Sequence, residues 1–388
     1  MLFQLRYEKN LTFNNMKKSM LSIAIAIISL AITANLSAQG YVFTDVVKVP
    51  ATSVKNQASS GTCWSYATAA FLESELLRTG KGDHDLSEMF AVRYNYINKM
   101  NDNYLRRGKG NLGQGSLAHM FTNIVKVYGI VPQEAYNGIN YDSELNNHRE
   151  LNKYINVISA GAVELKQKSP QYDILVEAVL DTYLGKVPEK FQYRGKEYTP
   201  LSFASETGLK MDDYIELTSL SHLPFYQASV IEVPDNWDYG RFWNVPLDEF
   251  MAIIDNALSN GYAVCWDGDV SEKGFSHKNG VAINPVEEMR EEALKFEKIY
   301  PEVKVDQKIR QQGYENFTTT DDHLMLLTGI SRDQEGNKYY ITKNSWGTER
   351  NSFGGYLNMS ESFVRAKSIS VMVHKNSIPK DILKKLKF

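Results

Sequence analysis

The stretch KNQASSGTCWSYATAAFLESELLR, residues 55–78, places a cysteine and a tryptophan at the start of an apolar, helix-forming run. Gly61 allows a sharp turn directly before Cys63. From Cys63 onward, apolar residues recur at helical spacing and β-branched residues are few, so the stretch predicts a helix over 63–78 that ends before Gly80. The cysteine is therefore expected in the first turn of this helix.

Cys63 is a candidate nucleophile because of this position. A thiol attacks as its thiolate, and the unpaired N–H groups at a helix N-terminus lower the pKa of a thiol. The chain has one other cysteine, Cys265, which the strand-like stretch GYAVCWDGDV predicts to be a core residue. A structural secreted protein with a Cys63–Cys265 disulfide is the alternative. The context of Cys63 argues against that alternative.

A cysteine nucleophile needs a base and a group that orients the base. Among the seven histidines, His323 begins the strand-like run HLMLLTGI, and the next strand-like run ends at Asn344. A turn around 333–337 predicts an antiparallel hairpin that places His323 opposite roughly 344–347. Asn344 can then accept a hydrogen bond from the imidazole, and Trp346 can shield that bond from water.

Gln57, six residues before Cys63, is a candidate donor to an oxyanion. Its amide and the backbone N–H of Cys63 can both donate to the oxygen that becomes charged during acyl transfer. A surface glutamine in a turn is the plainer alternative. Together with His323 and Asn344, Gln57 would complete a site for nucleophilic catalysis.

Three parts of the chain together resemble the active-site segments of papain-like cysteine peptidases. They are NQASSGTCWSYA, HLMLLTG, and KNSWG followed by GGYLNMS. The order Gln, Cys, His, Asn is the same. The long interval from Cys63 to His323 is similar to that of the subgroup of bleomycin hydrolase and the bacterial aminopeptidase C. LSEMF, VYGIVPQEAYNG, FWNVPLDEF, GDVSEKG and HKNSIPKDIL resemble that subgroup as well, so the resemblance covers most of the chain from about Val46.

This resemblance implies an α+β, papain-like two-lobe fold with a helical lobe and an antiparallel, β-barrel-like lobe. It implies that Cys63 is the nucleophile and that His323 is the general base and then the acid. Asn344 would orient His323, and Gln57 would line the oxyanion hole. The implied activity is thiol-dependent hydrolysis of peptide bonds through an acyl-enzyme, in the manner of an aminopeptidase.

Four further residues are expected at the substrate. The loop Gly113, Gln114 and Gly115 is similar to the strand that pairs with the substrate backbone, although such a loop can also simply lead into a helix. Trp346 is the fourth. The expected partner is a peptide or protein substrate. No cofactor and no metal is implied, and the sequence after His277 lacks a second metal ligand at helical spacing.

Length and charge limit the other functions. The 388 residues, 43% of them hydrophobic, are enough for a sizeable core. The formal net charge of −3 gives no overall attraction to nucleic acid or to an anionic membrane, and the basic tail KKLKF is typical of a solvated helix end. No nucleic-acid partner is expected. Assembly into a homo-oligomer is left open.

The first residues are typical of a secretory signal peptide. Lys17 and Lys18 precede the apolar run Leu21–Ile32, and ANLSAQG follows it, with Ala38 at the predicted cleavage site. Residues 1–38 are thus expected to be an upstream extension and signal peptide. The rest would be secreted or periplasmic, with no stable membrane contact after the signal is removed. An uncleaved anchor is the alternative, but the run is short for a membrane span.

Residues 39–388 are expected to form one cysteine peptidase domain. The helical lobe would span about 55–230, with an insertion of unassigned role near 142–230, and the β-rich lobe about 231–388. Local capping signals predict one helix from near Asp85 and another that Ser116 would cap.

The C-terminus bears on the mode of cleavage. In the subgroup, a C-terminal arm lies in the cleft and restricts cleavage to N-terminal residues. Here the chain stops at DILKKLKF, soon after the last matching segment, so the arm is expected to be short or absent. A broad endopeptidase with an open cleft is therefore an alternative to the aminopeptidase. A catalytically silent, peptidase-like binding protein is another, against which the intact Cys, His, Asn and Gln argue.

Overall fold

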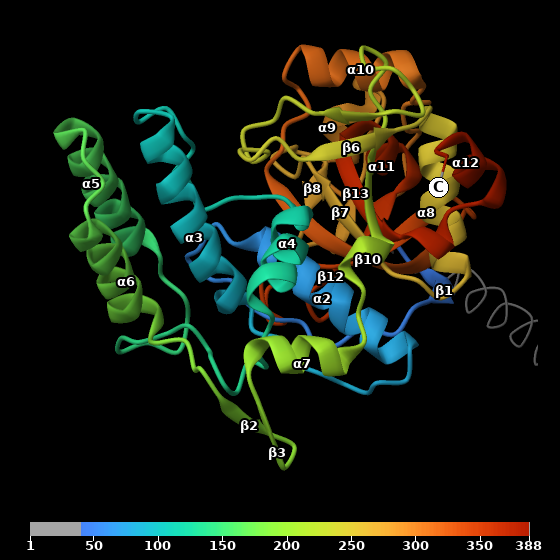
Figure 1. The fold of residues 1–388 in the computed structure, drawn as a ribbon. Coiled ribbons are helices and arrows are strands. Elements are labelled where there is room, and N and C mark those ends of the chain that lie inside the picture. Colours follow the sequence, from blue (N-terminus) through green and yellow to red (C-terminus); the bar gives the residue numbers. More distant parts are fainter. Residues whose placement is uncertain (1–39, 388) are drawn as a thin grey trace, which may run out of the picture.

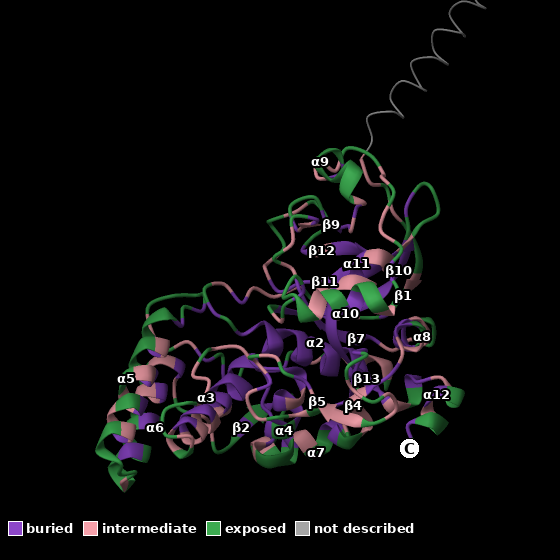
Figure 2. Ribbon diagram, turned by 90° about the horizontal axis from the view of Figure 1, so that it is seen from above, coloured by how far each residue is buried: buried purple, intermediate pink, exposed green. Residues whose placement is uncertain are grey.

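A buried helix, α2 (Cys63–Arg78), lies at the centre of the computed structural model, which describes residues 40–387 (Figures 1 and 2). Every residue of α2 from Cys63 to Leu76 is buried. The predicted helix over 63–78 is confirmed. The predicted signal peptide, residues 1–38, lies outside the described residues.

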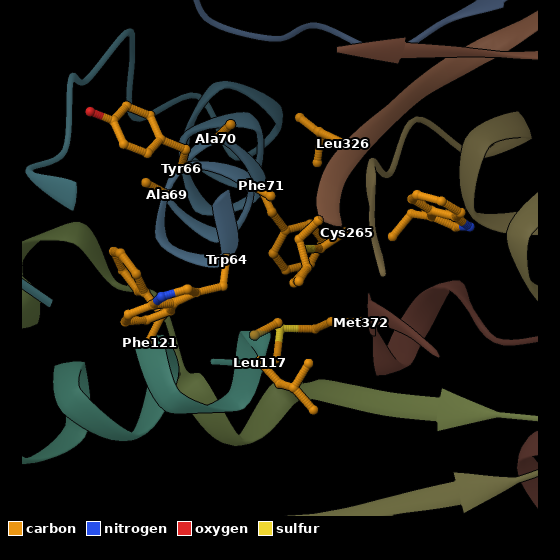
Figure 3. Packing of buried hydrophobic residues seen from close by; sticks show 14 of the residues in the cluster. Trp64, Tyr66, Ala69, Ala70, Phe71, Leu117, Phe121, Cys265, Leu326 and Met372 are labelled. Carbon is orange, nitrogen blue, oxygen red and sulfur yellow. The ribbon is translucent and has the colours of Figure 1, made fainter. Parts of the chain in front are cut away.

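Helix α2 is buried on all sides because both halves of the chain pack against it. Figure 3 shows part of one cluster that joins Trp64 and Phe71 of α2 to Phe121 of α4 (Ala118–Tyr128) and to strands β7 (Val264–Gly268) and β13 (Ser368–His374). Burial of each large apolar side chain contributes about 1.5–3 kcal/mol to the free energy of unfolding. The cluster therefore fixes where α2, and with it Cys63, lies between the helices and the sheet.

The other helices divide between two sides of α2, with α3 to α7 on one side and α8 to α12 around the sheet (Figure 1). In Figure 1, α3, α5 and α6 stand away from the sheet, whereas α8 and α12 lie beside it, and Figure 2 shows exposed outer surfaces on α5 and α6. The remaining described helices are α3 (Glu88–Leu105), α5 (Arg149–Leu165), α6 (Pro170–Leu184), α7 (Pro200–Thr207), α8 (Leu247–Ser259), α9 (Arg290–Ala293), α10 (Gln307–Glu315), α11 (Glu361–Lys367), α12 (Lys380–Lys385) and the short 3₁₀ helices η1 (Met211–Asp213), η2 (Glu287–Met289) and η3 (Lys375–Ser377). Between residues 40 and 387, none of the helices is long and apolar enough to cross a membrane.

The second half of the chain builds a large, mainly antiparallel sheet. Over residues 40–387 the strand order is β5 (Ala228–Val230), β6 (Arg241–Asn244), β4 (Tyr214–Thr218), β13, β7, β10 (His323–Arg332), β11 (Lys338–Lys343), β12 (Tyr356–Ser360), β9 (Val281–Ala282) and β8 (Phe275–Ser276), with β1 (Thr44–Lys48) paired to β10. β12 with β9, and β4 with β6, run parallel. In the part of the chain that is described, the end strands β5 and β8 do not pair, so the path stays open where a barrel would close.

The sheet begins earlier in the chain than expected. β4 and β5 precede residue 231, where the β-rich lobe was expected to start, yet both belong to the large sheet. The segment 142–230 therefore combines two kinds of structure. Its first part forms α5, α6, α7 and the separate hairpin β2 (Phe191–Tyr193) and β3 (Lys196–Tyr198), and its last part contributes strands to the sheet.

Both helices expected near Asp85 and after Ser116 are present, but the two residues expected to cap them are wrong. The N-cap of α3 is Ser87, whose hydroxyl accepts from a backbone N–H of the first turn, and Asp85 instead forms an ion pair with Lys55. Before α4, the Ser116 hydroxyl accepts a hydrogen bond from Trp237 Nε1 at 3.1 Å and does not cap the helix. In both places a residue distant in sequence engages the side chain that the local rule assigned to the cap.

Candidate active site

Cys63 lies where the first turn of α2 meets the first residues of β10. The backbone N–H of Leu324 donates a hydrogen bond to the Cys63 sulfur, and Leu324 directly follows His323. Only 9% of Cys63 is exposed. Two segments 260 residues apart therefore meet at the sulfur, as the predicted nucleophile and base require.

The charge state of the thiol differs from the expectation. Burial raises the pKa of Cys63 to about 12, although the hydrogen bond from the Leu324 N–H acts to lower this pKa. The carboxylates of Asp235, Asp321 and Asp267 act in the same direction as burial. Burial thus outweighs the helix N-terminus in this closed site, and the thiol is neutral. This direction is opposite to the lowering of the thiol pKa that the helix N-terminus was expected to give.

His323 is held by Asn344, as predicted. His323 Nε2 lies 2.8 Å from Asn344 Oδ1. The hairpin is the predicted one, with Leu326 opposite Lys343 across β10 and β11. Because Asn344 Oδ1 can only accept, Nε2 carries the proton and Nδ1 remains the basic nitrogen. Burial lowers the pKa of His323 to about 4, although the hydrogen bond from the ring to Asn344 opposes this shift, so the imidazole is neutral.

The amide of Asn344 has partners on both ends. Its Oδ1 also accepts from the Ser345 N–H at 2.7 Å, and its Nδ2 donates to His277 Nδ1 at 3.4 Å. These contacts settle which end of the amide faces His323. Sequence analysis assigned no role to His277, because it lies in a short turn after β8 and is 67 residues from Asn344. No local pattern indicates this contact.

Trp346 covers the same hydrogen bonds. Its ring lies 4.9 Å from the ring of His323 and 5.1 Å from that of His277, centroid to centroid. This placement agrees with the predicted shield over the His323–Asn344 bond. A contact of Trp346 with substrate stays a prediction.

Gln57 lies beside the segment that follows Asn344. Its Nε2 donates to the Ser60 carbonyl at 2.8 Å, its Oε1 accepts from Ser345 Oγ at 2.6 Å, and its backbone N–H donates to the Ser345 carbonyl at 2.8 Å. An amide nitrogen has two hydrogens, so the bond to Ser60 uses one of them. Gln57 is therefore held firmly between the Cys63 turn and the Asn344 segment.

The Gly113, Gln114 and Gly115 loop lies against the same turn. Gln114 Oε1 accepts from the Gly61 N–H at 2.7 Å, and the Gln114 carbonyl accepts from Trp64 Nε1 at 3.1 Å. Underneath, the buried Lys99 ammonium donates to the carbonyls of Gly113 and Gly115. The loop therefore flanks Cys63. Pairing of this loop with a substrate backbone stays a prediction.

Cys265 has no part in this site. It lies in β7, is 1% exposed and contacts Thr68, with 3.9 Å between Cys265 Sγ and Thr68 Oγ1. Both cysteines are free. The predicted core position of Cys265 is confirmed, and the alternative of a structural disulfide is wrong for this structure.

The lobes, the buried cysteine helix and the His–Asn pair define a cysteine peptidase with a papain-like fold. The Peptidase C1-like family matches residues 109–388, and the chain belongs to this family. The matched residues include His323 and Asn344, whereas Cys63 and Gln57 precede them.

Individual relatives agree with this assignment. The chain is 24% identical to Aminopeptidase C of Lactobacillus helveticus over 375 residues, which are 85% of this chain and 81% of that protein. It is 23% identical to Aminopeptidase G of Lactobacillus delbrueckii subsp. lactis over 380 residues, 86% and 83% of the two chains. The crystal structure of PepW from Lactobacillus rhamnosis HN001 gives a TM-score of 0.70 at 19% identity, over 92% of this chain and 86% of that one. This last likeness supports the fold.

Proposed function

We propose that this protein hydrolyses peptide bonds with Cys63 as nucleophile and His323 as base, and that it acts as an aminopeptidase. One observation carries the proposal: the start of α2 and the start of β10 meet at the Cys63 sulfur, and the adjacent imidazole is bonded to Asn344. This is the nucleophile, base and orienting group that acyl transfer needs.

The neutral thiol and neutral imidazole define the first step. Because both groups are uncharged in the closed site, the proton moves from Cys63 to His323 Nδ1 as the sulfur attacks the carbonyl carbon. Asn344 supports this transfer, since its Oδ1 accepts from Nε2–H and stabilises the imidazolium that forms.

The later steps use the same groups. The carbon–sulfur bond forms and the carbonyl oxygen becomes an oxyanion, toward which the Cys63 N–H and the second N–H of the Gln57 amide can donate. His323 gives its proton to the leaving nitrogen, and the carbon–nitrogen bond breaks. Water then attacks the thioester, His323 takes its proton and returns it to the sulfur, and the acid product leaves.

A substrate assay with matched cysteine variants tests this proposal. The expected result is turnover of short peptide amides by the wild type, a loss on the order of 10⁴-fold or more in kcat for Cys63→Ala, and near-normal kcat for the buried control Cys265→Ala. Activity that survives Cys63→Ala would refute the proposal. An inactive wild type that also fails to react with a thiol-directed epoxide would favour the silent binding protein.

The cleavage mode is tested with blocked peptides. Relatives named aminopeptidases support the exopeptidase mode for this chain. Free-amine peptides should then be cleaved much faster than the same peptides with an acetylated N-terminus. Efficient internal cleavage of blocked peptides would establish the endopeptidase alternative.

The proposed location is outside the cytoplasm. The basic, apolar and small-residue segments within residues 1–38 support export with removal of the signal peptide. Mass spectrometry of the protein from culture should find an N-terminus close to residue 39. An intact N-terminus on cell-bound protein would refute this proposal.

A further inference from the structure

We propose that the groove between α3 and α5, called here the α5 groove, binds a stretch of extended peptide substrate away from the scissile bond. The groove has a volume of about 560 Å³ and is lined by residues of α3, of α5 and of segment 108–113. This inference rests on the proposed peptidase function and adds a second binding region, which favours longer peptides over short ones.

Asn103 of α3 joins the two walls of the α5 groove. Its Nδ2 donates to Ser159 Oγ of α5 at 2.8 Å, and its Oδ1 accepts from the Gly110 N–H at 3.0 Å. Asn103 is 3% exposed, and a Cβ added at Gly110 would come within 2.7 Å of the Asn103 Cα. A residue without a side chain is therefore needed where this wall approaches α3. The two walls are thus fixed relative to each other before a ligand arrives.

One stripe of α5 faces the groove. Asn152, Asn156 and Ala160 line it, and residues four apart lie on the same face of a helix. Along this stripe α5 extends about 12 Å, because a helix rises about 1.5 Å per residue. An extended peptide rises about 3.4 Å per residue, so about three or four peptide residues fit along the stripe.

The chemistry of the stripe favours a peptide backbone. An amide side chain carries donor hydrogens and an acceptor oxygen, as a peptide group does. Asn156 Nδ2 uses one hydrogen on the Asn152 carbonyl at 2.7 Å and has a second one to donate. Asn152 Oδ1 is buried and has no hydrogen-bond partner among the described residues. Such an acceptor is costly unless a donor reaches it, and the N–H of a bound peptide is one.

The rest of the lining disfavours other ligand classes. None of the described residues that line the groove is aromatic, so a sugar ring or a nucleobase finds no ring to stack on. Glu164 is the one charged residue among these lining residues, so they offer no cation to a phosphate. Leu112 and Val163 add apolar surface that suits short aliphatic side chains. An uncharged stretch of polypeptide is the ligand that this lining fits.

The α5 groove begins beside the Cys63 turn. Gly113 lines the groove, and the next residue, Gln114, accepts from the Gly61 N–H at 2.7 Å. The buried Lys99 ammonium donates to the Gly113 carbonyl at 2.9 Å, so this end of the groove is fixed as well. Because Gly61 is two residues before Cys63, a peptide whose scissile bond lies at the sulfur can continue past Gly113 into the groove.

The first test fills the groove and compares a tripeptide with a nonapeptide that has the same first three residues. For the wild type, KM should be about tenfold lower with the nonapeptide, the size of one net hydrogen bond. Ala160 is exposed, so Ala160→Trp places a ring in the groove without changing the core. It should raise KM about tenfold for the nonapeptide and leave KM for the tripeptide within about twofold.

Val157→Trp is the matched control. Val157 is an exposed residue of α5 that does not line the groove, so this variant should change neither KM. Equal KM values for the two lengths in the wild type would overturn the inference. So would Ala160→Trp if it changed both substrates equally or changed neither.

A second measurement needs no turnover. Cys63→Ala protein should bind a fluorescein-labelled nonapeptide, and anisotropy should show about tenfold weaker binding after Asn152→Ala and Asn156→Ala are added. Ala160→Trp in the same protein should weaken binding equally and replaces the alanine variants if these do not fold. Unchanged affinity would overturn the inference. The two proposals fail separately: cleavage that does not depend on Cys63 refutes the peptidase, whereas Cys63-dependent cleavage without a length preference refutes only the groove.

Discussion

The two sides of the Cys63 sulfur are built from different chemistry. The imidazole side is the hydrogen-bonded and aromatic group of His323, Asn344, His277 and Trp346. The carboxyl side is the acidic set of Asp235, Asp321 and Asp267. Both are mostly buried, and burial favours the neutral form of every titratable group in them.

The difference lies in how each side satisfies its buried polar groups. On the imidazole side, the Asn344 amide has hydrogen-bond partners at both ends, so the base is oriented before any substrate arrives. On the carboxyl side, the buried Asp267 carboxyl, whose pKa is raised mainly by burial, hydrogen-bonds to the Asp321 carboxylate, so the two groups share one proton. The first side is arranged for proton transfer, whereas the second is a buried acidic group that holds a proton between two of its carboxyls.

The largest expected effect concerns the neutral thiol. Because the pKa of Cys63 is raised to about 12, its thiolate fraction should rise about tenfold per pH unit throughout the neutral range. Alkylation by iodoacetamide in Cys265→Ala protein should accelerate about a thousandfold from pH 6 to pH 9. A rate that is already high and flat between pH 5 and pH 8 would mean a preformed thiolate–imidazolium pair and would contradict this part of the comparison.

Gln57 should matter for chemistry and not for substrate choice. Gln57→Ala removes one donor from the expected oxyanion and should lower kcat about 10²- to 10³-fold. The loss should be equal for free-amine and acetylated substrates, because the oxyanion is the same in both. The Gln57→Glu side chain has the same length, but it places a carboxylate beside the oxyanion. This variant should therefore lower kcat at least as much as Gln57→Ala. A Gln57→Ala enzyme within threefold of the wild type would remove Gln57 from the mechanism.

His277 should have a smaller effect through Asn344. Replacement by phenylalanine removes the acceptor for Asn344 Nδ2, so the amide can turn and hold His323 less well. The expected result is about a tenfold loss in kcat, the size of one net hydrogen bond, with a shifted pH–rate profile. His277→Gln keeps an acceptor and should recover part of the loss. The exposed-loop variant His222→Gln is the control, and a parallel loss there would point to general destabilisation.

The smallest effect concerns stability near the carboxyl side. His119 Nδ1 is 2.6 Å from Glu216 and Nε2 is 2.8 Å from Asp238, which belongs to segment 231–240. Burial opposes the charged imidazole, but the two carboxylates raise the pKa of His119 to about 10. Since the folded pKa exceeds the ordinary 6.5, the contribution to stability is full below pH 6.5 and is lost as the pH rises through 10.

Melting curves of His119→Gln test the contribution of the charged His119 imidazole to stability. The wild type should melt higher than the variant by about 3 °C at pH 6, and the difference should shrink steadily toward pH 10. A difference that does not depend on pH would mean that the imidazole is not charged in the folded protein. His374→Gln is a suitable comparison, because burial lowers the pKa of that histidine and so gives the opposite sign.

Local patterns were enough where one element decides the outcome. The helix over Cys63–Arg78 follows from its apolar spacing and the glycine after its end. The His323–Asn344 bond also follows, because a hairpin with a short turn brings two strand ends together by geometry alone. The capping residues of two helices were mispredicted because Asp85 and Ser116 bind residues that are distant in sequence, namely Lys55 and Trp237.

Other features depend on chain segments that only the fold brings together. The sequence by itself determined the residue types and spacing of the site. A nucleophile, a base and their supporting groups need particular side chains at the ends of particular elements, and these are Gln57, Cys63, His323 and Asn344. Only tertiary packing decided three other features. These are the burial of Cys63, the contact of His277 with Asn344, and the close approach of Asp235 to Gly115. The physical reason is that burial and charge act through space. The pKa of a thiol depends on every segment that covers it, and no stretch of sequence states which segments those will be.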